Sequence, residues 1–407
     1  MMATGPRATN ASDGACVVTP DTVLVRARDV IVRLGDADNV SIMRGEDSFE
    51  ATPHALAVLH AFGHPRTVAD VLAVAASGPQ HWIELSSTVL QLAKAGVLRA
   101  PGESDAAPQG FARPTIHVVM LDDEPRTLGY LHALSAVMKR GDVVVDIGTG
   151  TGVLATSAAR AGAARVHAIE SSAIADAAER VFEANGVSDR VSLVRGRSTQ
   201  VTLPERADVL VTEIIGNDPL DELLLETVSD AKTRLLKPDA RIVPCAIEIL
   251  ALPVDVPRRV IERHVFTRER IAAWRATYGM DLSALLAVRL GPTQPIMVRT
   301  EEVLSWRRVA PPVSLVAIDL TRPFDLVLKS RVSFVLEEDV ERLGILLAFR
   351  ATLAPGIVLS TLAEDVHRES SWRYALWPAL DLPAAAGGTT AIIDYAYDRG
   401  TTTLHVS

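Results

Sequence analysis

The sequence predicts an α/β protein: a doubly wound parallel sheet followed by a mostly β domain and preceded by a small α+β domain. From Asp142 the chain reads DVVVDIGTGTGVLATSAARAGAARVHAIE, a strand, a glycine turn, a helix and a second strand; VSLVRG and ADVLVTEI then predict further strands. After about Ala246, short apolar strands separated by turns predominate, which is typical of a barrel or a sandwich.

The first hundred residues predict a leader and a small domain. The start has no apolar core and is therefore no signal peptide. Two strands are expected within VVTPDTVLVRARDVIVRLG, and three helices from Thr52, Thr67 and Trp82, with both threonines placed as N-caps. The expected boundaries are residues 1–15 (flexible leader), 16–100 (small domain), 101–113 (linker), 114–245 (parallel sheet) and 246–407 (β domain).

Composition excludes several classes of protein. The formal net charge is −9 without a compensating Lys/Arg block, which argues against a nucleic-acid partner. The two cysteines, Cys16 and Cys245, make neither a disulfide framework nor a zinc site and suit a reducing compartment. No apolar run approaches the roughly 18–20 residues that span a bilayer. We expect a cytoplasmic protein with no metal and no membrane partner.

Three glycines, Gly148, Gly150 and Gly152, directly follow the first strand of the parallel sheet. They permit a tight turn and close approach of a ligand to the backbone. A dinucleotide fingerprint would need glycine where Val153 stands, so the spacing favours S-adenosylmethionine over a nicotinamide cofactor. Glu170 ends the next strand, where a carboxylate can accept hydrogen bonds from ribose hydroxyls; nicotinamide enzymes use an acid similarly. A plain turn with a surface glutamate is the alternative.

From about Ile116 to the C-terminus, several segments resemble the protein arginine methyltransferases: IHVVMLDDEPRTLGY, VVVDIGTGTGVLATSAARAGA, VHAIE, TEIIGNDPLDELLLE, AAWRATYGMDLSAL and LSTLAEDVHRESSW. The resemblance implies a Rossmann-like class I methyltransferase domain, a β barrel-like domain, S-adenosyl-L-methionine as cofactor and S-adenosyl-L-homocysteine as product. Arg126 stands where the family's arginine holds the cofactor carboxylate, and Thr199 where the family has an adenine-side acid. The implied cofactor-binding residues are Met120, Arg126, Asp146, Gly148, Thr149, Gly150, Gly152, Glu170, Ser171, Arg197, Ser198, Thr199 and Glu213.

Two carboxylates, Glu213 and Glu222, stand nine positions apart around a Gly-Asn-Asp-Pro turn, at the spacing of the family's double-glutamate hairpin. Facing carboxylates can grip a planar guanidinium by bidentate, charge-assisted hydrogen bonds and orient one nitrogen toward a methyl donor. The same pair could hold an alkylammonium, which must lose a proton before attack. Solvated turn acids are the alternative interpretation.

The chain departs from the family at two loops. The hairpin lacks the family's Trp, Met and Tyr and has Ile214, Ile215 and Asn217 instead. The late loop, which resembles the segment reaching back to the active site, lacks the family histidine and reads Ser370, Ser371, Trp372. His367 is close in sequence and could replace that histidine. A structural role for His367 is the alternative. The late-loop residues expected at the site are His367, Ser371 and Trp372.

Two further segments carry resemblances. The helical stretch at about 264–290 resembles the arm through which the family dimerises, which implies a homodimer. Residues 16–100 resemble, by order of elements, the PqqD-like winged-helix modules that hold the leader of a ribosomally made precursor peptide. A lid or dimerisation module is the alternative for this segment.

The function expected from these patterns is an S-adenosylmethionine-dependent N-methyltransferase acting on a guanidine or amine nitrogen of a peptide or protein, in ribosomal-peptide maturation if the first domain binds a leader. A small-molecule methyltransferase, including one that acts on free arginine, is a second interpretation. A pseudoenzyme that binds a peptide without methylating it is a third.

Overall fold

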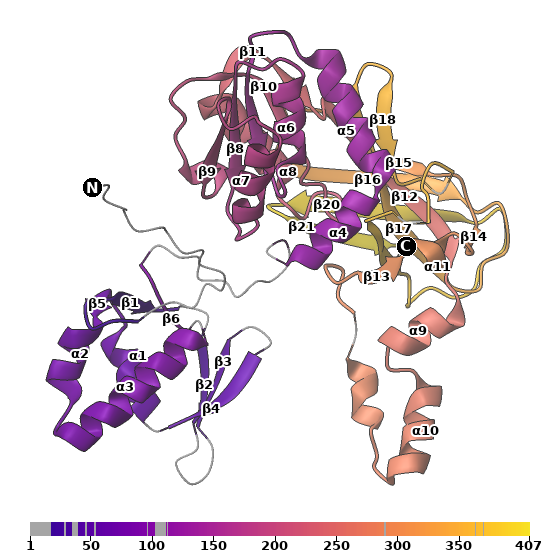
Figure 1. Ribbon diagram of the computed structural model, residues 1–407. Helices are drawn as coiled ribbons and strands as arrows, with labels where there is room; N and C mark the ends of the chain where they lie inside the picture. The colour runs from indigo at the N-terminus through magenta and orange to yellow at the C-terminus, as the bar shows by residue number, and fades with distance from the viewer. Residues whose placement is uncertain are drawn as a thin grey trace. The chain divides into compact units, whose positions relative to one another are not determined.

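The computed structural model describes residues 18–27, 30–34, 40–44, 47–52, 54–95, 97–101, 111, 113–288, 290–362, 364–368 and 370–407. The expected leader, residues 1–15, lies outside the described residues, as does most of the expected linker. The chain forms two compact units, Met1–Arg113 and Pro114–Ser407 (Figure 1). Among the described residues, no helix has the length and apolar character needed to cross a membrane.

The first unit has more strands than the two that the sequence predicted. Its elements are β1 (Val23–Arg26), β2 (Val30–Leu34), β3 (Val40–Arg44), β4 (Asp47–Ala51), α1 (His54–Ala61), β5 (Arg66–Thr67), α2 (Val68–Ala75), α3 (Pro79–Lys94) and β6 (Leu98–Arg99). The strands form two antiparallel sheets, β2–β3–β4 and β5–β1–β6. The prediction missed β3, a strand of five residues in which Val40 and Ile42 are buried, and β4, in which Asp47 and Glu50 obscure an apolar alternation.

Two helices of the first unit begin at residues that favour a helix start, a capping threonine and a proline. The backbone amide of Asp70 donates to Oγ1 of Thr67 at 3.1 Å, so the predicted N-cap of α2 is confirmed. The third helix begins at Pro79 rather than at Trp82, because proline at the first helical position loses no hydrogen bond.

The second unit starts with a five-stranded parallel sheet in the order β11–β10–β7–β8–β9. Since parallel strands end at the same edge, the residues after β7, β8 and β10 meet there. The strands are β7 (Val143–Ile147), β8 (Arg165–Glu170), β9 (Val191–Arg195), β10 (Ala207–Thr212) and β11 (Leu236–Val243), and the helices α4 (Pro114–Asp122), α5 (Glu124–Val137), α6 (Val153–Arg160), α7 (Ala175–Ala184) and α8 (Leu224–Arg234), with the short helix η2 (Ser198–Gln200).

The rest of the second unit is mostly β. One sheet runs β13–β19–β17–β12–β14, with β15 on β12 and β18 on β17, and a second runs β16–β20–β21. The strands are β12 (Ala246–Asp255), β13 (Ile296–Arg299), β14 (Arg307–Arg308), β15 (Val313–Asp319), β16 (Val327–Val335), β17 (Leu343–Ala354), β18 (Ile357–Ser360), β19 (Arg373–Pro378), β20 (Thr390–Asp398) and β21 (Thr401–Val406), and the helices α9 (Arg258–His264), α10 (Arg268–Tyr278), η3 (Ser283–Ala287) and α11 (Thr300–Val303).

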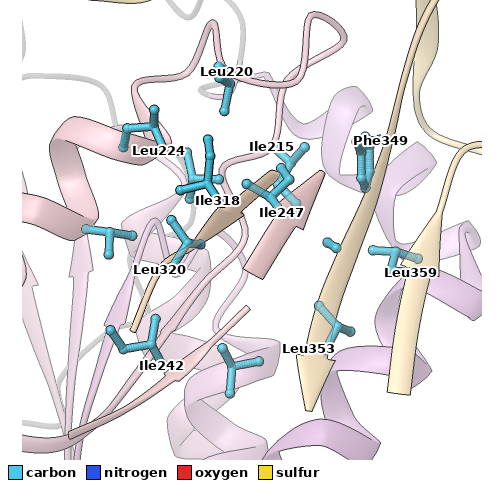
Figure 2. Packing of buried hydrophobic residues seen from close by; sticks show 14 of the residues in the cluster. Ile215, Leu220, Leu224, Ile242, Ile247, Ile318, Leu320, Phe349, Leu353 and Leu359 are labelled. Carbon is cyan, nitrogen blue, oxygen red and sulfur yellow. The ribbon is translucent and has the colours of Figure 1, made fainter. Parts of the chain in front are cut away.

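One apolar cluster joins the parallel sheet to the β strands of the second unit. Ile215, Leu220 and Leu224, from the segment after β10 and the start of α8, are almost completely buried. Figure 2 shows Leu224 close to Ile318 of β15, and Ile215 close to Ile247 of β12. The loop that carries Glu213 and Glu222 is therefore held by apolar contacts from both halves of this unit.

Candidate active site

The loop after β7 adopts the conformation that its glycines permit. Gly148, Gly150 and Gly152 have φ angles of +76°, +53° and +84°. A Cβ at Gly152, where α6 begins, would lie 2.5 Å from Cε1 of Phe182. This turn thus needs glycine both for its backbone angle and for the space above it.

Asp146, in strand β7, forms a hydrogen bond with the glycine loop. Its side chain is completely buried, and Oδ2 accepts a hydrogen bond from Oγ1 of Thr149 at 2.6 Å. Burial raises the pKa of Asp146 to about 7, against the opposing effect of the Thr149 hydroxyl. The sequence expectation placed both residues at the cofactor; the structure places Asp146 beneath the loop.

Glu170 ends β8 beside the glycine loop. Its Oε2 accepts from the amide of Gly150 at 2.9 Å, and Oε1 accepts from the amide of Ser172 at 2.8 Å. Each carboxylate oxygen can accept a second hydrogen bond. The two amides therefore orient Glu170 and leave it acceptor capacity for a ligand.

His117 was not predicted at the site, yet it lies against the glycine loop. It is the buried residue of α4, and its Cε1 lies 3.3 Å from the position that a Cβ would take on Gly150. The available signal was a single polar side chain facing inward from an apolar helix. That signal is weak without the fold, because a buried histidine is more often structural.

Arg126 lies at the centre of the site, in the first turn of α5. Its Nη1 donates to the backbone carbonyl of Met120 at 3.0 Å, and Nη2 forms an ion pair with Oε2 of Glu213. Its Cζ lies 5.5 Å from the ring centroid of Trp372, a cation–π arrangement. Burial lowers the pKa of Arg126, and the charge of Glu222 counteracts that effect.

Both acids of the hairpin act on the same guanidinium. Glu213 pairs with Arg126 directly, and Glu222 is near enough for the Arg126 charge to lower the pKa of its carboxyl. Burial is the larger effect and, with the charge of Asp221, raises the pKa of Glu222 to about 7. Glu213 is thus ion-paired with the buried guanidinium, and Glu222 lies within range of its charge.

Asp123, also not predicted, connects α5 to the late loop. This buried carboxylate accepts four hydrogen bonds: from the amide of Arg126 at 3.2 Å, Nε2 of His367 at 2.9 Å, and the amide and hydroxyl of Ser371 at 2.7 and 2.9 Å. The late loop is consequently attached beside Arg126.

Trp372 attaches the late loop to the acidic hairpin. Its Nε1 donates to the carbonyl of Ile215 at 2.7 Å. Oδ1 of Asn217 accepts from the amide of Arg373 at 2.6 Å. The carbonyl of Ile215 is a backbone group that any residue would offer, whereas the side chain of Asn217, at which the hairpin departs from the family pattern, is specific to this chain.

A cavity of about 260 Å³ lies next to Asp123, lined by Pro125, Val358, His367, Ser370 and Trp372 among others. Of the other residues expected at the cofactor, Ser171, Arg197 and Thr199 are exposed after the ends of β8 and β9. Ser198 is buried, and its carbonyl accepts from Nη2 of Arg234 at 2.6 Å. In the part of the chain that the structure describes, none of these four residues forms a hydrogen bond or ion pair with Arg126, Glu213 or Glu222.

The parallel sheet, the glycine loop after β7 and the acid that ends β8 define a Rossmann-like methyltransferase. Residues 123–247 match the model of the ribosomal protein L11 methyltransferase (PrmA) family. The solved Trypanosoma brucei PRMT1 enzyme–prozyme heterotetrameric complex with AdoHcy shares the fold, with a TM-score of 0.61 and 24% identity over 73% of this chain and 94% of that chain.

Curated relatives define the family more closely. A probable protein arginine N-methyltransferase 6.1 of Oryza sativa subsp. indica is 30% identical over 267 residues, 60% of this chain and 69% of that protein. A probable protein arginine N-methyltransferase 6 of Arabidopsis thaliana is 37% identical over 205 residues, 49% of this chain and 46% of that protein. The chain therefore spans about half the length of the Arabidopsis relative. It belongs to the protein arginine N-methyltransferase family.

Proposed function

We propose that this protein is an S-adenosylmethionine-dependent N-methyltransferase whose acceptor is a guanidine or amine nitrogen of a peptide or protein. The observation that carries the proposal is the ion pair of Glu213 with the buried guanidinium of Arg126, with Glu222 within range of the same charge, at the edge of the sheet where the glycine loop lies. Family membership supports both the methyl donor and a protein acceptor.

The residues present fit S-adenosylmethionine. The glycine loop leaves no Cβ between the backbone and a ligand, and Glu170 retains acceptor capacity for ribose hydroxyls. Arg126 has five N–H groups. One on Nη1 donates to the carbonyl of Met120 and Nη2 pairs with Glu213, so the remaining groups can bind a ligand carboxylate. Bound there, the cofactor supplies a methyl group on a sulfonium centre.

The two acids would hold the acceptor and help to remove its proton. A cationic acceptor that replaces part of the Arg126 interaction would find two carboxylates for charge-assisted hydrogen bonds. Positioning of its nitrogen would supply most of the rate enhancement. The pKa of Glu222, about 7, suits a group that accepts the proton released from nitrogen near neutral pH.

His367 would act as a positioning residue for the late loop. Its Nε2 contacts Asp123, the buried carboxylate that also accepts from the amide of Arg126 and from Ser371, and its side chain is one-third exposed. This arrangement would compensate for the absence of a histidine at Ser370 and Ser371.

We also propose that the first unit recognises a leader segment of the substrate, as its resemblance to winged-helix peptide-recognition modules suggests. The exposed side chains of Trp82, Ile83 and Leu90 on α3 support an apolar contact. If the proposal is correct, methylation of a candidate precursor peptide by the full chain depends on that peptide's leader. Equal methylation of the leaderless peptide would reject it.

A cytoplasmic homodimer is the assembly that we propose. Exposed Tyr278 and Met280 on the arm, and exposed Val118 and Leu121 on α4, support a protein contact at these places. Light scattering of the purified protein should give twice the chain mass of 43.6 kDa. Replacing Tyr278 and Met280 with Ser should yield a monomer.

The central test is Glu213→Gln. It removes the negative charge at the acceptor position, so methyl transfer to peptides should be abolished while cofactor affinity, measured by calorimetry, stays nearly unchanged. The matched control is Glu205→Gln, which changes a glutamate paired with Arg165 on the surface. Unchanged turnover in Glu213→Gln would reject the acceptor-binding role.

A further inference from the structure

The loop that carries Glu222 rests on the hairpin formed by β20 and β21. A Cβ added to Gly400, in the turn of this hairpin, would lie 2.8 Å from Cδ2 of Leu223 and 3.4 Å from the carbonyl oxygen of Asp221. Leu223 itself has a φ of +63°, which is rare for a leucine. The residues on both sides of Glu222 are thus in close contact with this turn.

A polar cluster lies beneath the same loop. Asp218, Thr402 of β21 and Tyr395 of β20 are 6%, 4% and 2% exposed. Oδ1 of Asp218, Oγ1 of Thr402 and the Tyr395 hydroxyl are buried without a hydrogen-bond partner among the described residues. Thr402 is nevertheless close enough to both of the others for side-chain hydrogen bonding with its hydroxyl to lower the pKa of Asp218 and that of Tyr395. The three groups thus form one buried polar cluster with Thr402 between Asp218 and Tyr395, in which a small adjustment of the side chains completes the hydrogen bonds that buried polar groups need.

A third contact holds the chain just after the loop. Helix α8 begins at Leu224, and the Tyr397 hydroxyl of β20 donates to Oε2 of Glu226 at 2.8 Å. The β20–β21 hairpin therefore contacts the chain before Glu222, on both sides of it and after it. Among the described residues, neither strand of this hairpin forms a hydrogen bond or ion pair with Arg126 or Glu213.

We propose that Asp218 is a positioning residue that attaches the acid-bearing loop, and with it Glu222, to the β20–β21 hairpin through Thr402 and, beyond it, Tyr395. This inference rests on the proposed function, in which Glu222 holds the acceptor. It adds a residue and a strand pair outside the site that determine where that carboxylate lies.

The protonation state of Asp218 determines the pH range in which the acid-bearing loop stays attached to the β20–β21 hairpin. Burial raises its pKa to about 7; the Thr402 hydroxyl opposes this and the charge of Asp221 adds to it. On the facing strands, Thr402 interacts with Asp218, and Tyr395 interacts with both. No positively charged group among the described residues lowers the pKa of Asp218. The uncharged acid is therefore the buried form and can donate to the Thr402 hydroxyl, whereas ionisation favours opening of the loop.

Hydrogen exchange of the full-length protein tests this inference directly. Protection of the amides in 213–224 should fall as pH rises above 7 in the wild type, by up to about tenfold per pH unit for one linked proton. Asp218→Asn keeps the size and hydrogen bonding without a charge, so its protection should match the wild type at pH 6 and persist at pH 8.5. Thr402→Val and Asp218→Leu should lower protection at both pH values.

Glu222→Gln is the control, because the pKa of Glu222 is also raised; its exchange should keep the pH dependence of the wild type. The same pH-dependent loss in Asp218→Asn, or full protection in Thr402→Val, would overturn the proposal. Exchange needs neither methyl donor nor acceptor, so a failure of the proposed methyl transfer would not change this result. In an active preparation, Thr402→Val should lower kcat more than it raises KM, while Asp218→Asn should retain wild-type kcat near pH 7.

Discussion

Nε2 of His367 lies 2.9 Å from Oδ1 of Asp123, although 244 positions separate the two residues in the sequence. The same carboxylate caps the helix that carries Arg126 and accepts two hydrogen bonds from Ser371. A single buried acid thus connects the proposed cofactor arginine with the late loop, and perturbing it should affect both.

Replacement of Asp123 by Asn tests this connection. An amide has one acceptor oxygen, and its NH₂ group would face donors, so at least one buried donor would lose its partner. The free energy of unfolding should fall by about 1–3 kcal/mol, measured by urea denaturation. The adjacent, exposed Asp122 offers the control, and Asp122→Asn should leave stability nearly unchanged. Equal stability of the two variants would show that Asp123 does not hold the loop.

The pH dependence of methyl transfer should report the ionisation of Glu222. The carboxylate form holds a cation and accepts a proton, so kcat/KM should rise as pH increases through about 7 when it is measured in Asp218→Asn, in which the loop stays attached above that pH. Asp221→Asn removes a negative charge that raises this pKa and should move the midpoint to lower pH. A profile that keeps its midpoint near 7 in Glu222→Gln would assign the titration to another group.

Glu170→Ala should weaken the binding of S-adenosylhomocysteine by about 1.5–3 kcal/mol, the range for hydrogen bonds to charged groups, which corresponds to roughly 10- to 150-fold in Kd. Part of the loss would come from the Gly150 amide, which loses its acceptor. Calorimetry of the variant beside Glu205→Ala, a change at an exposed ion pair, measures the effect. Wild-type affinity in Glu170→Ala would reject the ribose-binding role.

Gly152→Ala should destabilise the protein more than Gly186→Ala does. Both glycines have positive φ, but a Cβ at position 152 would lie 2.5 Å from Phe182, whereas nothing lies within 4 Å of one at position 186. Both variants carry backbone strain of roughly 1–2 kcal/mol. The difference between their free energies of unfolding therefore measures the clash with Phe182, about 1–3 kcal/mol. Thermal unfolding monitored by circular dichroism would detect it, and similar midpoints would contradict the packing argument.

Local sequence patterns predicted the parts of the fold whose cause is local. Alternation of strands and helices indicated the parallel sheet, and the glycines of DIGTGTG indicated the turn that the structure has, with positive φ at all three. Thr67 was predicted as an N-cap from its neighbours alone. The strands β3 and β4 were missed because each has only five residues and their pairing depends on residues from both strands.

The site could be predicted only in part for the same reason. Glu213 and Glu222 were predicted from their spacing around a turn together with the resemblance of this segment to the family's double-glutamate hairpin. His117 and Asp123 were not, because nothing in their immediate sequence distinguishes them from a structural histidine or a helix-capping acid. Their placement beside Gly150 and His367 results from contacts between segments far apart in the chain.

The sequence by itself determined the elements, the glycine turn and the supply of acids, because backbone angles and side-chain periodicity are set by neighbouring residues. Only the tertiary structure decided which acids are buried, which of them share Arg126, and that Asp218 faces Thr402 and Tyr395. Burial and long-range pairing set the charge of a carboxyl group, and both arise from the packing of the whole second unit.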